Sequence, residues 1–125
     1  NHNITHDCKY HVVFTPKYRR AVLIHGVDTD FLRIAREVCA ETGTELISAE
    51  AMPDHVHLLL RCDPQRGVHR VVKQIKGRSS RILRETHPWL RKRLPTLWTN
   101  AYFVSSVGAV SLETVRAYVE AQKGV

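Results

Sequence analysis

The sequence predicts an α+β protein: a ferredoxin-like (RRM-like) antiparallel sheet with helices packed on it, followed by an additional C-terminal helix. Three observations lead to this prediction. The chain of 125 residues has the length of one domain. It contains no internal repeat or Gly/Ser-rich linker. Its hydrophobic periods give the order β-α-β-β-α-β-α, which begins with the split βαβ pattern of ferredoxin-like domains. We therefore treat residues 1–125 as one folding unit.

The first two elements can be recognised from residue type and period. KYHVVFT, residues 9–15, is rich in β-branched and aromatic residues and is followed by a proline, which predicts a strand. A helix is expected next, because Asp28 or Thr29 can cap it and Gly43 supplies a left-handed residue that ends it. Its apolar stripe consists of Phe31, Ile34, Ala35 and Val38.

The middle of the chain predicts a hairpin and a long helix. Residues 45–52 and 55–62 have the composition of strands, and the turn residues Pro53 and Asp54 between them indicate a hairpin. From Gln65 to Thr86 the helical period returns. One stripe of this helix contains Val68, Val72, Ile75, Ser79 and Ile82.

The last elements complete the pattern. Residues 87–95 are expected to form a loop or a short turn of helix. Residues 97–107, LWTNAYFVSSV, are predicted to be a strand that ends at Gly108. Ser111 can then cap the final helix.

The composition indicates a basic protein outside the membrane. Nineteen Lys and Arg against twelve Asp and Glu give a net charge of +7 and a pI near 9.7, a balance that attracts nucleic acid before an anionic membrane surface. No segment approaches the ~18 consecutive apolar residues of a membrane-spanning helix, and the first residues lack the pattern of an export signal. We expect a soluble cytoplasmic protein associated with the nucleoid. The cysteines are widely spaced, which predicts reduced, buried thiols: Cys8, Cys39 and Cys62.

Two histidines, His55 and His57, stand one residue apart in the apolar strand segment MPDHVHLLL. Because side chains alternate across a strand, both imidazoles share one face about 6 to 7 Å apart at Cα, and both can reach one cation. Two ordinary polar residues on the wetter face of a half-buried strand would give the same pattern. The other histidines show no comparable pairing and are expected to be surface or structural residues: His2, His6, His11, His25, His69 and His87.

Positive charge is concentrated in the predicted long helix and just after it. Ten Lys or Arg and a single acid lie between Arg66 and Arg93, and much of this charge falls opposite the apolar stripe on a helical wheel. Gly77 lies within that face, where a glycine permits close approach of a phosphate backbone. A solvated face of a basic protein is the alternative. The candidate DNA-binding residues are Arg66, Arg70, Lys73, Lys76, Arg78, Arg81 and Arg84.

The predicted final helix carries a tyrosine and a glutamine four residues apart, Tyr118 and Gln122. Side chains at this spacing lie side by side, here on the shoulder of the helix, where they can face a cleft. A helical tyrosine is more often a core or rim residue. Spacing alone does not select Tyr118 over the other tyrosines.

Taken together, these segments resemble the HUH-type single-tyrosine transposases, the TnpA proteins of insertion sequences that move as single-stranded DNA, and the related REP-associated tyrosine transposases. The resemblance runs the length of the chain, although Ala101 stands where relatives often have Gly. It rests on an H-x-H strand followed by a helical Y-x-x-x-Q, within YHVVFTPKYRR (10–20), AMPDHVHLLL (51–60), KQIKGRSSRIL (73–83), YFVSSVG (102–108) and YVEAQ (118–122).

The resemblance implies an enzyme that cleaves and rejoins DNA strands. By it, His55 and His57 hold Mg²⁺ or Mn²⁺, and Gln122 contributes its amide oxygen as a third ligand. Tyr118 is then the nucleophile, which forms a 5′-phosphotyrosine with single-stranded DNA. Asp54 is a candidate for orienting a ligating histidine from behind.

The resemblance also implies partners. Relatives are homodimers in which the tyrosine helix of one subunit can serve the histidines of the other, and they recognise imperfect hairpins in single-stranded DNA. The connection at residues 108–110 is compatible with such an arm. Two other functions fit the residues: a non-catalytic nucleic-acid-binding module, and a metal-dependent nuclease that uses water as its nucleophile.

Overall fold

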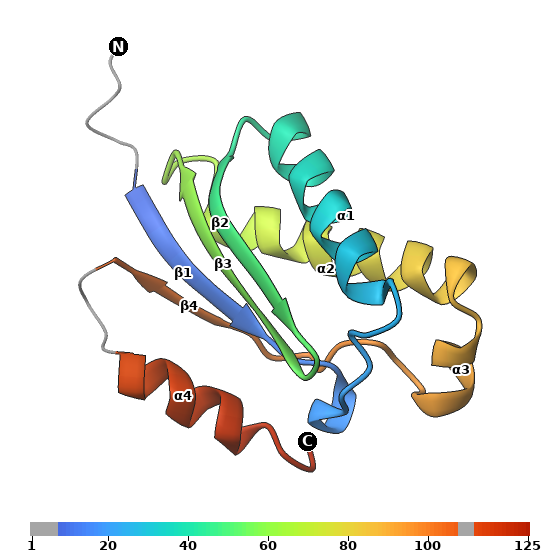
Figure 1. Cartoon of the computed structure of the whole chain (residues 1–125). Coiled ribbons are helices and arrows are strands. Elements are labelled where there is room, and N and C mark those ends of the chain that lie inside the picture. The colour runs from blue at the N-terminus through green and yellow to red at the C-terminus, as the bar shows by residue number, and fades with distance from the viewer. Residues whose placement is uncertain (1–7, 108–111) are drawn as a thin grey trace.

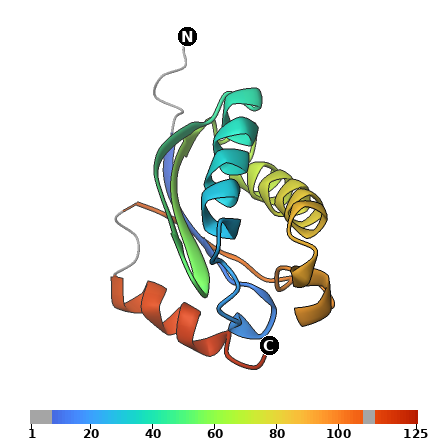
Figure 2. The ribbon, with the colours of Figure 1, turned by 45° about the vertical axis from the view of Figure 1, so that its right-hand side comes forward.

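The computed structural model describes residues 8–107 and 112–125, and it confirms the predicted fold class. Four antiparallel strands form one sheet in the order β2-β3-β1-β4. Helices α1 and α2 cover one face of the sheet, and α4 lies on the other face (Figures 1 and 2). The elements are β1 (Cys8–Phe14), α1 (Val27–Glu41), β2 (Glu45–Met52), β3 (His55–Cys62), α2 (Val68–Thr86), α3 (Trp89–Arg93), β4 (Phe103–Ser106) and α4 (Leu112–Ala121).

The central strand β3 separates the two faces. Its even-numbered residues, including Val56 and Leu58, are fully buried against the helices, and the odd-numbered ones are only half-buried. The predicted stripe of α1 (Phe31, Ile34, Ala35 and Val38) is likewise fully buried. On the opposite face Val13 of β1 is also fully buried, and α4 contacts this strand. The sheet therefore has a large core on one side and a smaller covered area beneath α4 on the other.

An aromatic cluster joins the sheet to the segment that follows α3. Phe14 packs edge-to-face on Phe31 and Trp98, with ring centroids 5.9 and 4.7 Å away. Such edge-to-face pairs add to the stabilisation given by the buried area alone. Trp98 donates its indole hydrogen to the Ser79 hydroxyl at 3.0 Å, so a polar residue of the predicted α2 stripe has a partner in the core.

The hairpin strands have the predicted bounds, but the caps and starts of the helices differ. α1 begins at Val27 after Gly26, which has a left-handed φ of 93°, so the prediction that Asp28 or Thr29 caps this helix is wrong. Asp28 lies in the first turn instead, where its carboxylate interacts favourably with the helix dipole. Gly43 does adopt the expected positive φ after the helix end. The expected cap Ser111 and the expected connection at residues 108–110 lie outside the described residues.

The predicted strand at residues 97–107 is shortened to Phe103–Ser106. The reason lies in Lys76, whose ammonium group donates to the carbonyls of Thr99, Asn100 and Ala101 at 2.6, 3.3 and 3.2 Å. Three successive carbonyls that converge on one ammonium group cannot belong to an extended strand, in which the backbone alternates in direction from residue to residue. Trp98 makes only an isolated bridge with Pro16.

No disulfide joins the cysteines, as predicted, and Cys39 and Cys62 are buried; Cys8 is only partly buried at the start of β1, so the prediction of burial is wrong for this residue. Burial raises the pKa of the Cys39 thiol to about 11, which keeps it protonated and unreactive at neutral pH. In the described part of the chain, no helix is long and apolar enough to cross a bilayer.

The Ser79 hydroxyl provides a test of the core. Ser79→Ala leaves the buried indole N–H of Trp98 without its acceptor, so we expect a loss of about 1–3 kcal/mol in the free energy of unfolding, measured by urea denaturation. The control is Ser80→Ala, which changes a neighbouring serine whose side chain makes no hydrogen bond to the described residues. Equal free energies of unfolding for the two variants would contradict a stabilising hydrogen bond from Trp98 to Ser79.

Candidate active site

The two histidines of β3 line a cavity between the β2–β3 hairpin and helix α4. Its volume is about 490 Å³. His55 and His57 reach it because they alternate with the buried residues of β3 and so point away from the main core. The lining residues come from the hairpin and from one side of α4: Glu50, Met52, His55, His57, Val115, Arg116, Val119 and Glu120.

The carboxylate of Asp54 orients His55. One oxygen of Asp54 accepts a hydrogen bond from Nδ1 of His55 at 2.8 Å, and the other pairs with Nε of Arg19 at 3.1 Å. Because a carboxylate can only accept, the proton of the neutral ring is on Nδ1 and the lone pair on Nε2. A carboxylate that supports a metal-ligating histidine makes the same kind of hydrogen bond.

His57 has a partner that the sequence did not reveal, since His11 was expected to be an unpaired surface or structural residue. Nδ1 of His11 lies 3.1 Å from Nε2 of His57, and the ring centroids are 5.2 Å apart. The antiparallel register of β1 on β3 places Val13 opposite His57, so His11 lies diagonally across on the same face. Burial, and then the neighbouring His11, lowers the pKa of His57. A lowered pKa leaves the ring neutral at physiological pH, the form that binds a metal.

Tyr118 and Gln122 lie on the face of α4 that covers the sheet, but beside the cavity and not in its lining. The Tyr118 ring packs against Phe103 of β4, with centroids 5.4 Å apart. Its hydroxyl and Oε1 of Gln122 are both buried without a hydrogen-bond partner among the described residues. Burial raises the pKa of Tyr118. The structure thus brings the helix to the histidine face but makes no hydrogen bond from Tyr118 to His55 or His57.

His55 and His57 can form a cation site only with a further ligand, and the side-chain amide of Gln122 is the candidate. Within residues 8–107 and 112–125, no three or more His, Cys, Asp or Glu side chains are grouped to hold a metal ion. The orphaned Oε1 of Gln122 is a buried acceptor that lacks a donor, and such a group is costly unless a cation or hydrogen bond satisfies it. Two imidazoles and one carbonyl oxygen fit a small divalent ion that keeps open positions.

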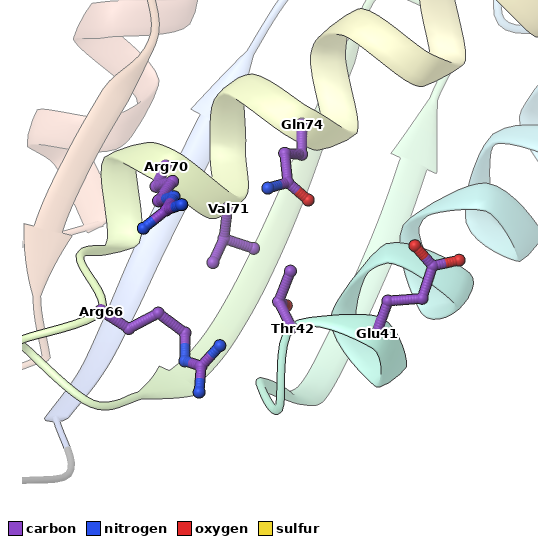
Figure 3. Close-up of a pocket in the computed structure, with 6 residues that line it drawn as sticks. All are labelled: Glu41, Thr42, Arg66, Arg70, Val71 and Gln74. Atoms are coloured by element: carbon purple, nitrogen blue, oxygen red, sulfur yellow. The ribbon is translucent and has the colours of Figure 1, made fainter.

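Arginines at the start of α2 line a second cavity, of about 260 Å³. Figure 3 shows Arg66 and Arg70 at one side of it and Glu41, at the end of α1, at the other. Glu41 already forms a bidentate ion pair with Arg78, at 2.6 and 2.8 Å, whereas Arg66 and Arg70 have no ion-pair partner among the described residues. The other lining residues are Thr42, Val71 and Gln74.

The remaining candidate DNA-binding residues divide into two groups. Lys73 and Arg81 are exposed on α2. Lys76 is bound to the loop carbonyls of residues 99–101, and burial lowers its pKa to about 8; Arg84 donates to the Leu94 carbonyl at 3.0 Å. Lys76 and Arg84 therefore hold the protein's own backbone. All of α2 lies on the face of the sheet opposite the histidine pair (Figure 2).

Comparison with known sequences finds transposases in each case. Residues 4–122 match the family model described as "Transposase IS200 like". The chain is 35% identical over 119 residues to the ISDra2 transposase TnpA of Deinococcus radiodurans, covering 94% of this chain and 85% of that protein. It is also 35% identical over 104 residues to the transposase for insertion sequence element IS200 of Salmonella typhimurium, covering 82% of this chain and 68% of that one.

Comparison with solved structures agrees. A crystal structure of a candidate transposase from Deinococcus radiodurans R1 superposes with a TM-score of 0.89 at 32% identity, covering 100% of this chain and 98% of that one. A REP-associated tyrosine transposase bound to a REP hairpin superposes with a TM-score of 0.60 at 12% identity, covering 90% of this chain and 62% of that one. The second likeness is one of fold.

Proposed function

This chain belongs to the IS200-like transposase family, and from that premise we propose that it cleaves and rejoins single-stranded DNA at insertion-sequence ends through a covalent bond to Tyr118. The observation that carries the proposal is the packing of α4 on the histidine face of the sheet. This packing sets the helix of Tyr118 and Gln122 against the cavity that His55 and His57 line. The strands of DNA would enter between this helix and the hairpin.

We assign the metal ligands to His55, His57 and Gln122. Asp54 accepts from Nδ1 of His55, which leaves Nε2 of that ring to face a metal ion, and burial lowers the pKa of His57, which favours its neutral, metal-binding form. A bound Mg²⁺ or Mn²⁺ would neutralise charge that develops on the phosphate during the reaction. The buried amide oxygen of Gln122 would be the third ligand atom. Because an amide is neutral, it would add no negative charge that repels the phosphate.

The proposed step exchanges one phosphoester bond for another. The Tyr118 oxygen forms a bond to phosphorus and the bond from phosphorus to the 3′ oxygen breaks, which leaves a 5′-phosphotyrosine and a 3′-hydroxyl. The phenolic proton is lost and the departing 3′ oxygen gains one, so protons balance. Because phenolate is a better leaving group than an alkoxide, the reverse step can join a strand without ATP. The Tyr118 hydroxyl is buried here, so the proposal requires that α4 shifts before DNA reaches it.

We propose that the α2 side of the molecule binds DNA hairpins through its unpaired basic residues, Arg66, Arg70, Lys73 and Arg81. These residues and the histidine pair lie on opposite faces of one sheet. DNA held by α2 must therefore pass around a sheet edge, or reach the active site of a second subunit. A homodimer in which each active site contains residues of both subunits would allow the second route. The proposal therefore predicts such a homodimer.

The central experiment is capture of the covalent adduct. Labelled single-stranded oligonucleotide carrying the element end is incubated with protein and Mn²⁺ and then denatured. We expect label to remain on the wild-type protein, to be lost with Tyr118→Phe and to persist with Tyr102→Phe. Chelation should abolish the adduct but spare hairpin binding. Binding without any cleavage would indicate a non-catalytic module, and cut ends without adduct would indicate a nuclease that uses water.

The raised pKa of Tyr118 gives a pH prediction. Burial favours the neutral phenol, so at neutral pH only a small fraction is phenolate. This fraction grows about tenfold per pH unit below the pKa. We expect the single-turnover rate of adduct formation at saturating Mn²⁺ to increase between about pH 7 and pH 9. A rate that falls over this range, with hairpin binding constant, would contradict phenolate attack.

The arginine-lined cavity gives a salt prediction. If Arg66 and Arg70 each neutralise a phosphate, the double variant Arg66→Ala/Arg70→Ala should weaken hairpin binding and reduce the slope of log K against log salt by about 1.4 to 1.8, from 0.7 to 0.9 per phosphate. The matched control is Arg20→Ala/Arg36→Ala, which removes the same charge from exposed positions outside α2. Equal slopes for the two variants would show that only net charge matters.

A further inference from the structure

One arginine contacts both halves of the candidate active site. Nε of Arg19 pairs with Asp54 at 3.1 Å, and Nη1 pairs with Glu120 of α4 at 2.9 Å and lies 3.4 Å from the Val119 carbonyl. Asp54 in turn holds His55. A single side chain thus connects the carboxylate behind a proposed metal ligand with the helix that carries Tyr118 and Gln122.

The backbone around Arg19 is arranged to deliver this contact. Tyr18 and Arg19 both have positive φ, 61° and 53°, in a short turn at Lys17–Arg19 between β1 and α1. Consecutive non-glycine residues in the left-handed region are uncommon, and such strain persists where surrounding contacts enforce it. Here Lys17 N–H donates to the Leu97 carbonyl at 2.8 Å, and Tyr18 N–H donates to the Val125 carbonyl at 2.7 Å. The second bond ties the turn to the segment that follows α4.

The Arg19 side chain is well enclosed, with 17% of its surface exposed, whereas that of Glu120 is 65% exposed. An ion pair with so exposed a partner is weak on its own. The second acceptor is the Val119 carbonyl in the last turn of α4, which also accepts from the Gln122 backbone N–H at 3.1 Å. Nη1 of Arg19 therefore contacts both the backbone and a side chain at the end of α4, while Nε of the same rigid guanidinium group pairs with Asp54.

We propose that Arg19 is a positioning residue that couples the docking of α4 to the orientation of His55. Through Asp54 it fixes the imidazole, and through Glu120 and Val119 it holds the helix that covers the histidine face. A role of Arg19 in catalysis rests on the proposed function. The link that Arg19 makes between α4 and His55 can be measured on the protein without DNA. A lysine at this position, with one ammonium group in place of the planar fork, can serve one of the two partners well but not both.

The first arm of the test measures helix docking without metal or DNA. Amide hydrogen exchange of residues 112–125 is compared for wild type, Arg19→Ala, Glu120→Gln and Asp54→Asn. We expect exchange to be about fivefold faster in Arg19→Ala, as a contact of this strength implies, faster to a smaller degree in Glu120→Gln, and unchanged in Asp54→Asn. Exchange of β1 and β3 amides is the control that each variant is folded.

The second arm measures Mn²⁺ affinity of the same proteins by electron paramagnetic resonance. We expect about a tenfold loss for Asp54→Asn and Arg19→Ala, the lower end of the effect of removing an outer partner of a ligating histidine, and no loss for Glu120→Gln. Arg19→Lys should keep either the wild-type exchange of α4 or the wild-type Mn²⁺ affinity, but not both. Only Arg19→Ala should change both measurements, which a merely local role of the arginine would not do.

Two results would overturn the coupling: Arg19→Ala with wild-type exchange in α4, or Arg19→Ala with wild-type Mn²⁺ affinity while Asp54→Asn loses it. Failure of the proposed function is separable from these results. A wild-type protein that binds no Mn²⁺ and forms no adduct would refute the metal-dependent chemistry, and the exchange arm would still decide whether Arg19 holds α4.

Discussion

The arrangement of the whole molecule depends on the alternation of side chains along β3. Four residues of this strand, Val56, Leu58, Leu60 and Cys62, are buried among α1 and α2 and fix the strand in the sheet. The same alternation turns His55 and His57 to the other face. A slip of one residue would bury two imidazoles in an apolar core and expose the core residues. The hydrophobic effect that stabilises the fold therefore also sets the direction of the proposed metal ligands.

Short sequence patterns were sufficient to predict the features that depend only on residues close together in the chain. The hairpin strands, the histidine pair and the amphipathic α2 were all visible in short windows, because a strand or helix period acts within a few residues. His11 was missed because its contact with His57 depends on the register of β1 on β3, which no single segment encodes. Arg19 was missed because its position depends on two left-handed residues outside glycine. The strand at residues 97–107 was predicted too long because Lys76, far away in sequence, binds three of its carbonyls.

The sheet also divides the charge of the protein. The basic residues of α2 without an ion-pair partner in the described part of the chain, and the cavity of Figure 3, lie on the helix-covered side. On the histidine face, Asp54, Glu50 and Glu120 lie close to the imidazoles together with Arg19 and Arg116, so positive charge there is largely balanced. A long-range positive field would collect DNA on the α2 side. Contacts of that kind position a strand but do no chemistry, so affinity and catalysis can be assigned to different surfaces. This division explains why a charge pattern alone pointed to a substrate but not to a reaction.

The position of Tyr118 has a further consequence for how such a site is controlled. Its hydroxyl is buried, has no partner among the described residues and has a raised pKa because of that burial, so the docked helix holds the proposed nucleophile in its least reactive form. An unpaired buried hydroxyl destabilises the docked arrangement, while the bonds from Arg19 to Glu120 and Val119 and from Tyr18 to Val125 stabilise it. These contributions act together with the apolar packing of α4, in which the Tyr118 ring contacts Phe103, and all of them change when the helix leaves the sheet. A phosphate and a divalent cation that satisfied Tyr118 and Gln122 would favour the arrangement of α4 in which they bind, since a ligand shifts such an equilibrium by its difference in affinity for the two states.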